Sequence, residues 1–166
     1  MSRSHSTLHP FLLTGHCLEH RVNAEISRAL RFDTTLCISL FAVDEWAQLD
    51  NTYGQGCADS VVADIAALLA EDLRTEDVAS YRGDGTFLAV LPDSDEESGE
   101  IQAERFREVV EATRFSYGDT TLRVTISAGV AQWVSEEAIE EDIERAQGAL
   151  SNASKKGNNQ VSLAGD

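Results

Sequence analysis

The amino-acid sequence predicts one α/β (α+β) domain, in which a mixed β-sheet is flanked by helices. The chain has 166 residues, of which 42% are hydrophobic, and this is the size and composition of a single globular domain. Residues 36–43 form a nearly unbroken apolar run, which is typical of a strand buried on both faces of a sheet. Segments of helical and strand periodicity alternate, and glycine-containing turns join some strands directly, so we expect parallel and antiparallel pairing in one sheet.

The first half of the chain starts with an N-terminal lead over residues 1–12, and we assign residues 13–166 to the domain. An amphipathic helix is expected to end near Phe32, before the apolar run that we place at the centre of the sheet. A short helix over residues 46–53 comes next, stopped by Gly54. The long helix that follows has one apolar face, made by Val61, Val62, Ile65, Leu68, Leu69 and Leu73.

The middle of the chain predicts a β-hairpin followed by a helix. Residues 78–82 and 86–91 are strand candidates, and Gly83-Asp84-Gly85 between them is typical of a hairpin turn. Pro92 ends the second strand. An acidic loop then leads into a helix marked by Ile101, Phe106, Val109 and Val110.

The last part of the chain predicts a second hairpin and a closing helix. Residues 115–117 and 122–130 alternate in polarity and are joined through Gly118-Asp119, so we expect them to form one hairpin. The final helix is expected to begin at Ser135 and to stop at Gly157, before a short strand.

The charge balance excludes several classes of partner. The chain has 29 acidic and 13 basic residues, a formal net charge of -16, and such a surface repels nucleic-acid phosphates and anionic lipid headgroups. We therefore expect neither nucleic acid nor a membrane as partner. The three cysteines lack CxxC spacing, and no run approaches the roughly 20 apolar residues of a bilayer span. These features predict a cytoplasmic protein with reduced thiols.

Five short motifs follow one another along most of the chain. They are Leu13-Thr14-Gly15, the segment from Val43 to Asp59, the hairpin from Tyr81 to Pro92, the strand from Val124 to Val130, and the segment from Ala149 to Val161. In this order they resemble the landmarks of the GGDEF family, the diguanylate cyclases that condense two GTP molecules into cyclic di-GMP. The hairpin corresponds to the family's signature, here in the degenerate form Gly83, Asp84, Gly85, Thr86 and Phe87. The resemblance implies a mixed sheet, one GTP per domain, and catalysis only between two facing domains.

The same resemblance shows that the groups needed for cyclase chemistry are missing. Two-metal phosphoryl transfer requires carboxylates that hold the ions, and the family's metal-binding positions correspond here to Ala42, Gly85 and Thr86. The family's phosphate-binding basic positions correspond to Ala47, Ser154 and Asn158. We therefore expect no magnesium cofactor, no other metal and no enzymatic activity.

An Arg-x-x-Asp motif, Arg74 to Asp77, lies before the signature at the distance at which many family members carry an inhibitory product site. A guanidinium can bind guanine edges or phosphate oxygens, and a carboxylate accepts from guanine N–H groups. The resemblance adds Arg105 on the following helix, and Arg82 adjoins the signature. These four residues form the predicted cyclic di-GMP site. The alternative is that Arg74 ends its helix and pairs only locally with Asp77.

Two further positions that contact guanine in the family are partly retained, as Asp50 and Asp59. They form a vestigial guanine pocket or, alternatively, cap the helices that follow them.

The sequence thus predicts a catalytically inactive receptor for cyclic di-GMP that forms a homodimer and signals to an unidentified protein partner. A second hypothesis is a dimerisation or protein-interaction module that binds no nucleotide. A third is a residual enzyme whose metal site is rearranged around Asp44, Asp50 and Asp84.

Overall fold

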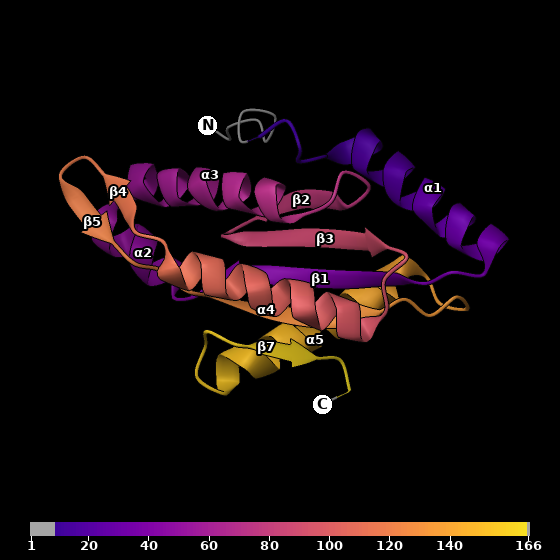
Figure 1. The fold of residues 1–166 in the computed structure, drawn as a ribbon. Helices are drawn as coiled ribbons and strands as arrows, with labels where there is room; N and C mark the ends of the chain where they lie inside the picture. Colours follow the sequence, from indigo (N-terminus) through magenta and orange to yellow (C-terminus); the bar gives the residue numbers. More distant parts are fainter. Residues whose placement is uncertain (1–8, 166) are drawn as a thin grey trace.

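The computed structural model describes residues 9–165, so the first eight residues of the expected lead lie outside it. Helices and strands alternate along this range (Figure 1). In chain order they are α1 (Gly15–Phe32), β1 (Leu36–Val43), α2 (Trp46–Tyr53), α3 (Gln55–Asp72), β2 (Val78–Gly83), β3 (Thr86–Pro92), α4 (Glu96–Ala112), β4 (Phe115–Tyr117), β5 (Thr120–Leu122), β6 (Ile126–Gln132), α5 (Ile139–Lys155) and β7 (Val161–Leu163).

A five-stranded sheet with the order β2-β3-β1-β6-β7 forms the centre of the domain. β1 pairs antiparallel with β3 and β6, whereas β6 and β7 are parallel. β1 is buried along almost its whole length, because it has a strand on each edge and helices on each face. The predicted mixed sheet with residues 36–43 at its centre is confirmed.

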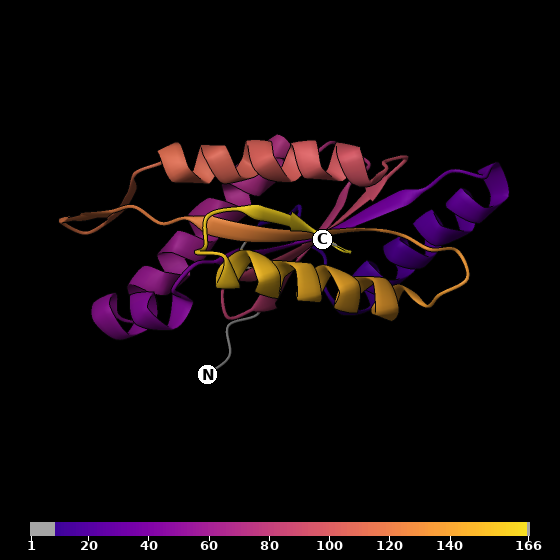
Figure 2. The same cartoon turned by 90° about the horizontal axis from the view of Figure 1, so that it is seen from below.

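Helices cover both faces of the sheet (Figure 2). Side chains alternate between the faces of a strand, so β1 contributes to two separate hydrophobic clusters. Phe41 faces α3 and α4, where it meets Phe106 edge-to-face with ring centroids 5.3 Å apart. Ile38 faces α1 and α5, together with Val22 and Leu150. The apolar face predicted for residues 61–73 is the face of α3 that packs on the first of these clusters.

The predicted second hairpin is corrected by the structure. β4 pairs only with β5, as a separate two-stranded sheet. The alternating residues after position 122 instead continue into β6, which lies between β1 and β7. Periodicity showed that the whole segment is extended, but it could not show that the chain changes partners, because pairing depends on contacts far away in sequence.

The predicted start of the last helix is also wrong by four residues. α5 begins at Ile139, and the segment from Ser135 forms a turn in which the Glu137 N–H donates to the Val134 carbonyl at 3.1 Å. The Val134 N–H donates to Asp142 Oδ1 at 3.4 Å, so this buried carboxylate holds the turn that precedes the helix.

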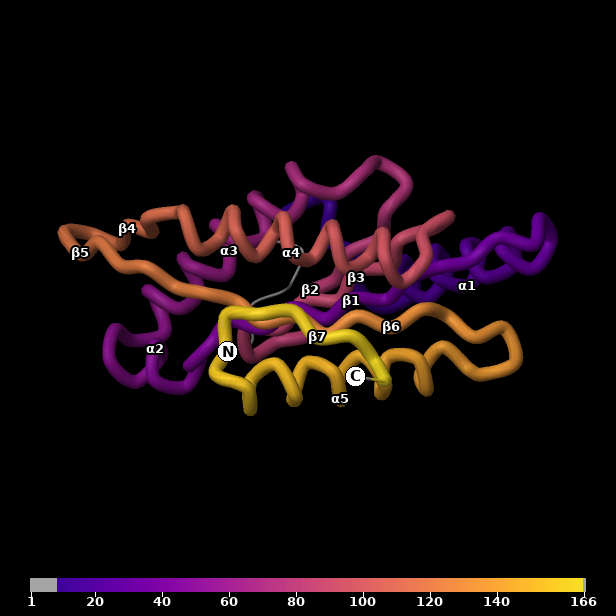
Figure 3. Tube along the Cα trace, turned by 60° about the horizontal axis from the view of Figure 1, so that its bottom comes forward, coloured from indigo at the N-terminus to yellow at the C-terminus, as the bar shows by residue number. Residues whose placement is uncertain are grey.

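Several segments meet at one end of the domain. The C-terminal end of β1 leads directly into α2 there, and the β4–β5 hairpin and the start of α3 lie at the same end (Figure 3). At the edge of the sheet, Leu12 forms a parallel bridge with Ala79 and is 7% exposed, so the last residue of the expected lead packs on the domain. None of the helices within residues 9–165 has the length and apolar character needed to cross a bilayer.

Candidate functional site

The predicted Arg-x-x-Asp motif forms a closed turn between α3 and β2. The Arg74 backbone N–H donates to Asp77 Oδ2 at 2.8 Å, and the Arg74 guanidinium donates to both carboxylate oxygens, at 3.4 and 3.0 Å. The Asp77 N–H donates back to the Arg74 carbonyl at 3.1 Å. The Asp77 side chain is 3% exposed, whereas that of Arg74 is 48% exposed. The local pairing that the sequence offered as an alternative is therefore present.

The Arg74 guanidinium also fixes the end of β3. Its Nη2 donates to the Pro92 carbonyl at 2.9 Å and to Ser94 Oγ at 3.1 Å. The bond to Asp77, assisted by nearby carboxylates, raises the pKa of Arg74 above its ordinary value, so the group stays cationic. Within residues 9–165, Nη1 forms one ion pair, with Glu76 Oε1 at 3.5 Å. One edge of the guanidinium is thus committed to the fold, whereas the other is partly exposed and has only the longer contact with Glu76.

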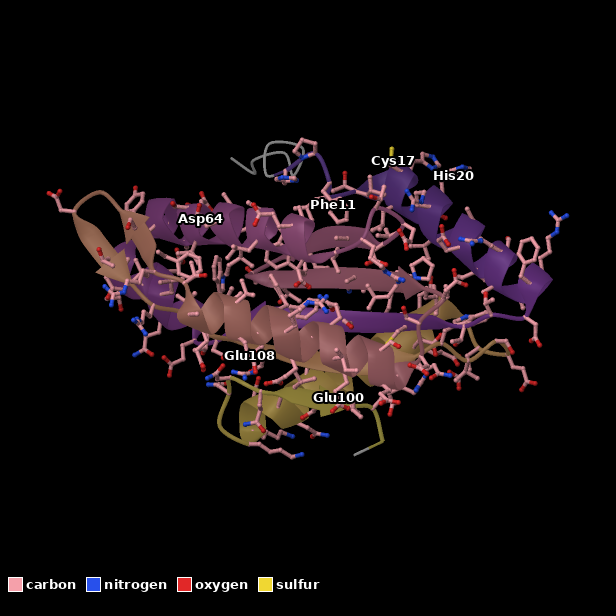
Figure 4. The ribbon with its side chains drawn as sticks, in the orientation of Figure 1. Phe11, Cys17, His20, Asp64, Glu100 and Glu108 are labelled. Carbon is pink, nitrogen blue, oxygen red and sulfur yellow. The ribbon has the colours of Figure 1, made fainter. Side chains whose placement is uncertain are left out.

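Arg105 reaches the same region from α4. Its Nε and Nη2 donate to the two Asp72 oxygens at 2.8 and 3.2 Å, and Asp72 also accepts from Gln102 Nε2 at 2.8 Å. The Arg105 side chain is 53% exposed, so its outer face is accessible. The exposed side of α4 also carries acids on either side of Arg105, among them Glu100 and Glu108 (Figure 4).

A pocket of about 210 Å³ lies between these groups. Its lining is drawn from the end of α3, the end of β3 and one face of α4, and comprises Asp72, Arg74, Asp77, Leu91, Asp93, Ser94, Ser98, Gln102 and Arg105. Pockets that enclose whole small molecules usually measure about 300–1,000 Å³. This one is therefore suited to enclosing part of a ligand, such as one base.

Gln102 lines this pocket and has a buried acceptor without a donor. The residue is 6% exposed, and its Oε1 has no hydrogen-bond partner among residues 9–165. A buried acceptor without a donor costs about 1–3 kcal/mol, and a ligand N–H would remove that cost. Sequence reasoning did not identify Gln102 or Asp72. The only signal was spacing, since Gln102 lies three residues before Arg105 and helical neighbours share a face.

The structure brings three of the four predicted ligand residues together and leaves the fourth elsewhere. Arg74, Asp77 and Arg105 line the pocket. Arg82 lies at the other end of β2, at a bulge beside the signature turn, and is not among the lining residues. Proximity in sequence was misleading here, because an extended strand moves about 3.3 Å away with each residue.

The predicted signature segment, residues 83–87, contains the tight turn between β2 and β3. Gly83, Asp84 and Gly85 all have positive φ values, of 92°, 49° and 74°. The Gly85 N–H donates to the Tyr81 hydroxyl at 2.9 Å, and the Gly85 carbonyl accepts from the Val43 N–H at 2.9 Å. Burial raises the pKa of Tyr81, so this hydroxyl stays neutral. The backbone of the turn is thus bound within the protein.

The indole of Trp46 covers Gly85, which the resemblance predicts to correspond to a metal-binding position. A Cβ atom added at Gly85 would lie 2.7 Å from Trp46 Cε3 and 2.9 Å from Cδ2. The matching strand position, Ala42, is paired with Thr86 on one side and with Ser127 on the other. Neither Ala42 nor Gly85 has a side-chain donor atom, and the space above Gly85 is filled. These residues do not fit a magnesium ion.

The rearranged metal site of the third hypothesis is not assembled either. Asp44 accepts from the hydroxyls of Thr125 and Ser127, both at 2.7 Å, and from the Asn159 N–H at 2.9 Å. Its carboxylate joins the end of β1 to β6 and to the loop before β7. Within residues 9–165, no group of three or more His, Cys, Asp or Glu side chains is placed to hold a metal ion.

Asp50 and Asp59 do not cap helices, which corrects one of the two alternatives for them. Asp50 lies inside α2 and Asp59 inside α3, and the N-cap positions of these helices are Glu45 and Gly54. Gly54 has φ 88°, so the chain turns between the helices at that residue. Asp59 lies near enough to help raise the pKa of Tyr81.

Comparisons with known proteins identify the family that the chain resembles. The family described as "Diguanylate cyclase, GGDEF domain" matches residues 13–160. Diguanylate cyclase DgcP of Pseudomonas aeruginosa is 29% identical over 147 residues, covering 89% of this chain and 22% of that protein. Diguanylate cyclase A of Treponema denticola is 30% identical over 131 residues, covering 78% of this chain and 35% of that protein. The chain thus spans between a fifth and about a third of the length of these relatives.

Solved structures show the same fold. Diguanylate cyclase SiaD of Pseudomonas aeruginosa, in complex with its activator SiaC, aligns with a TM-score of 0.83 and 28% identity, covering 89% of this chain and 56% of that one. The GGDEF domain of DgcB from Caulobacter crescentus, in complex with c-di-GMP, aligns with a TM-score of 0.85 and 21% identity, covering all of this chain and 97% of that one. The family match over most of the chain and the shared fold show that this chain belongs to the GGDEF family of diguanylate cyclase domains.

Proposed function

We propose that this GGDEF domain is a catalytically inactive, cytoplasmic receptor for cyclic di-GMP, which binds through Arg74, Asp77 and Arg105, acts as a homodimer and signals to a partner protein. The observation that carries the proposal is the contrast between two regions of the same domain. The pocket at the end of β3 has two half-exposed guanidinium groups and a buried acceptor without a donor. The region of the metal positions has lost its carboxylates.

The chemistry of the pocket suits a guanine base with an attached phosphate. The carboxylates of Asp72 and Asp77 and the free Gln102 oxygen can accept from the N–H groups of guanine. The exposed edges of Arg74 and Arg105 can donate to its O6 and N7 atoms or to a phosphate. The crystallised complex of DgcB with c-di-GMP shows that a protein of this fold binds the nucleotide, and SiaD shows that one associates with a protein activator.

Loss of catalysis follows from the same reasoning applied to the signature. Ala42 and Gly85 offer no metal ligand, and Trp46 fills the space in which a side chain at position 85 would extend. Without cations, the negative charge that develops during phosphoryl transfer has nothing to neutralise it in a protein of net charge -16.

Isothermal titration calorimetry with cyclic di-GMP tests the receptor proposal. We expect binding by the wild-type chain and a loss of about ten- to a hundredfold in affinity for Arg74→Ala, since a bond to a charged group contributes about 1.5–3 kcal/mol. Arg82→Ala is the matched control, because this arginine lies outside the pocket and should leave affinity unchanged. No heat from the wild type, or equal losses in both variants, would refute the proposal.

Because Arg74 also fixes the turn and the end of β3, a second variant separates binding from folding. Gln102→Met removes both the unpaired acceptor and the Nε2 donor to Asp72, while it keeps the volume of the side chain, so the lost bond and the removed unpaired acceptor offset each other in stability. We expect weaker binding of cyclic di-GMP with a melting temperature close to that of the wild type. Weaker binding only in variants that also melt early would indicate a structural role for the cluster.

One observation favours the second candidate, a protein-interaction module that binds no nucleotide. Arg74 and Arg105 are already paired with Asp77 and Asp72, so a ligand must compete with these carboxylates or use only the outer edges of the arginines. Absence of calorimetric heat together with an intact fold would support this candidate. Incubation with GTP and magnesium tests residual catalysis, and formation of any cyclic dinucleotide would overturn the proposed inactivity.

A further inference from the structure

The β4–β5 hairpin projects from one end of the domain (Figures 1 and 2), and within residues 9–165 its two strands pair only with each other, so each strand has an outer edge. The side of β4 is the one that α3 contacts, and there the Tyr117 side chain lies against Gly56. The outer strand is β5, and it borders an open pocket of about 680 Å³ between the hairpin and α2. The structure thus leaves space beside β5.

The hairpin register shows which backbone groups point outward. Tyr117 pairs with Thr120 across the two-residue turn, in which Gly118 has φ 59°. The pair that closes such a turn exchanges both hydrogen bonds, and hydrogen-bonded pairs alternate with non-bonded ones. Thr121, opposite Ser116, therefore directs its N–H and C=O away from β4. The backbone hydrogen bonds found outside the helices and ladders of residues 9–165 include none to Thr121 or Arg123.

The charges on the hairpin differ from those of the whole protein. Residues 114–123 contain Arg114, Arg123 and Asp119 as their charged side chains, so this segment is locally positive in a chain of net charge -16. Arg123 and Asp119 are exposed, and neither has an ion-pair partner within the described part of the chain. Two copies of an acidic protein repel each other least where their surfaces are locally basic or balanced.

We propose that two copies of this chain associate by antiparallel pairing of their β5 edges around a two-fold axis at Thr121. When Thr121 of one copy pairs with Thr121 of the other, position 119 of each copy lies opposite position 123 of the other copy. Each Arg123 then lies opposite Asp119 of the second copy, so the interface contains two symmetric pairs of opposite charge. The outward groups of Thr121 and Arg123 fit this register, because residues two apart share an edge.

This interface adds a surface to the homodimer proposed above, and it does not depend on nucleotide binding. β5 has three residues, and so short an edge gives a reversible dimer rather than a permanent one. We therefore expect dimerisation to depend on protein concentration in buffer without cyclic di-GMP. Absence of calorimetric heat would refute the receptor and leave this interface intact, whereas absence of a β5-mediated dimer would leave the binding of cyclic di-GMP intact.

Sedimentation velocity over a range of concentrations tests the interface with two charge reversals. Asp119→Arg and Arg123→Asp each place like charges opposite one another at two positions, so we expect each to weaken the dimer by about tenfold or more. The double variant restores opposite charges and should recover the dimer. Arg114→Asp is the matched control, because Arg114 lies outside the proposed charge pairs.

Hydrogen–deuterium exchange on the wild-type chain gives a second readout that needs no substitution. The amides of Thr121 and Arg123 should become protected as concentration rises, while the amide of Thr120, which is paired within the hairpin, should not change. A chain that remains monomeric, a dimer insensitive to the charge reversals, or a folded double variant that stays monomeric would each overturn the proposal.

Discussion

A substitution at Gly85 tests whether the metal position of the signature is closed by Trp46. Gly83 and Gly85 flank the same turn, and both have a positive φ, of 92° and 74°. Any residue with a Cβ costs about 1–2 kcal/mol in this conformation. At Gly83 an added Cβ would meet no atom within 4 Å, whereas at Gly85 it would lie 2.7 Å from the indole. The backbone cost is therefore shared by the two positions, and the steric cost is not.

We expect Gly83→Ala to destabilise the domain by about 1–2 kcal/mol, through backbone strain alone. Gly85→Ala should lose about 1–3 kcal/mol more, which is the usual cost of overpacking a filled site. Urea unfolding followed by circular dichroism measures both values. In a Trp46→Leu background, which empties the space over position 85, the difference between the two glycine variants should vanish. Equal losses in the native background, or a difference that persists without the indole, would refute the reasoning.

The same contact has a functional consequence. Ala42→Asp combined with Gly85→Asp puts back the two carboxylates, yet the second side chain has no room beneath Trp46. We expect this double variant not to acquire a Mn²⁺ site detectable by electron paramagnetic resonance. Tight Mn²⁺ binding by the double variant with Trp46 intact would show that the position is open.

Three further predictions concern single side chains. Asp44 accepts three hydrogen bonds that join the end of β1 to the start of β6 and to the loop before β7. We expect Asp44→Ala to lower the free energy of unfolding in urea by about 2–4 kcal/mol. A free energy of unfolding equal to that of the wild type would contradict this role. Asp95 caps α4 by accepting from the Ser98 N–H at 2.8 Å, and this bond holds the pKa of Asp95 below its ordinary value of 3.8. The stabilisation by this cap is therefore complete above pH 3.8 and is lost as pH falls through the lower pKa of the folded state. We expect Asp95→Ala to weaken the acid dependence of the melting temperature. An unchanged profile of melting temperature against pH would contradict this role. Burial raises the pKa of Cys37 to about 12, whereas Cys17 is exposed on α1 beside His20 (Figure 4). Thiol labelling at pH 8 should therefore modify Cys17 alone until the protein is unfolded. Labelling of Cys37 in the native protein would show that the core opens.

The order of helices and strands was predictable from sequence where the pattern depended on local chemistry. The run from Leu36 to Val43 has no polar alternation apart from Ser39, and only a strand buried on both faces accommodates such a run. The glycines around Asp84 permit positive φ, and they specified the turn of the first hairpin. The second hairpin was predicted wrongly. The residues after Leu122 remain extended, but in β6 they pair with β1 and β7 and not with β4.

The candidate site divides in the same way. The absence of a donor at Ala42 and Gly85 is a property of the residues themselves, so the sequence alone excluded the usual metal ligands. Which groups share a pocket depends on the path of the backbone. Tertiary structure placed Arg105 of α4 beside Arg74 and left Arg82 about a strand's length away.

The sequence by itself determined the family, the mixed sheet and the absence of a carboxylate at Ala42 and Gly85, because motif chemistry and periodicity are encoded within short segments. Only the tertiary structure decided that Trp46 covers Gly85, that the buried Gln102 oxygen has no donor among residues 9–165, and that β5 has an open edge. These features join residues that are distant in the chain, and contacts of that kind arise from packing rather than from local preference.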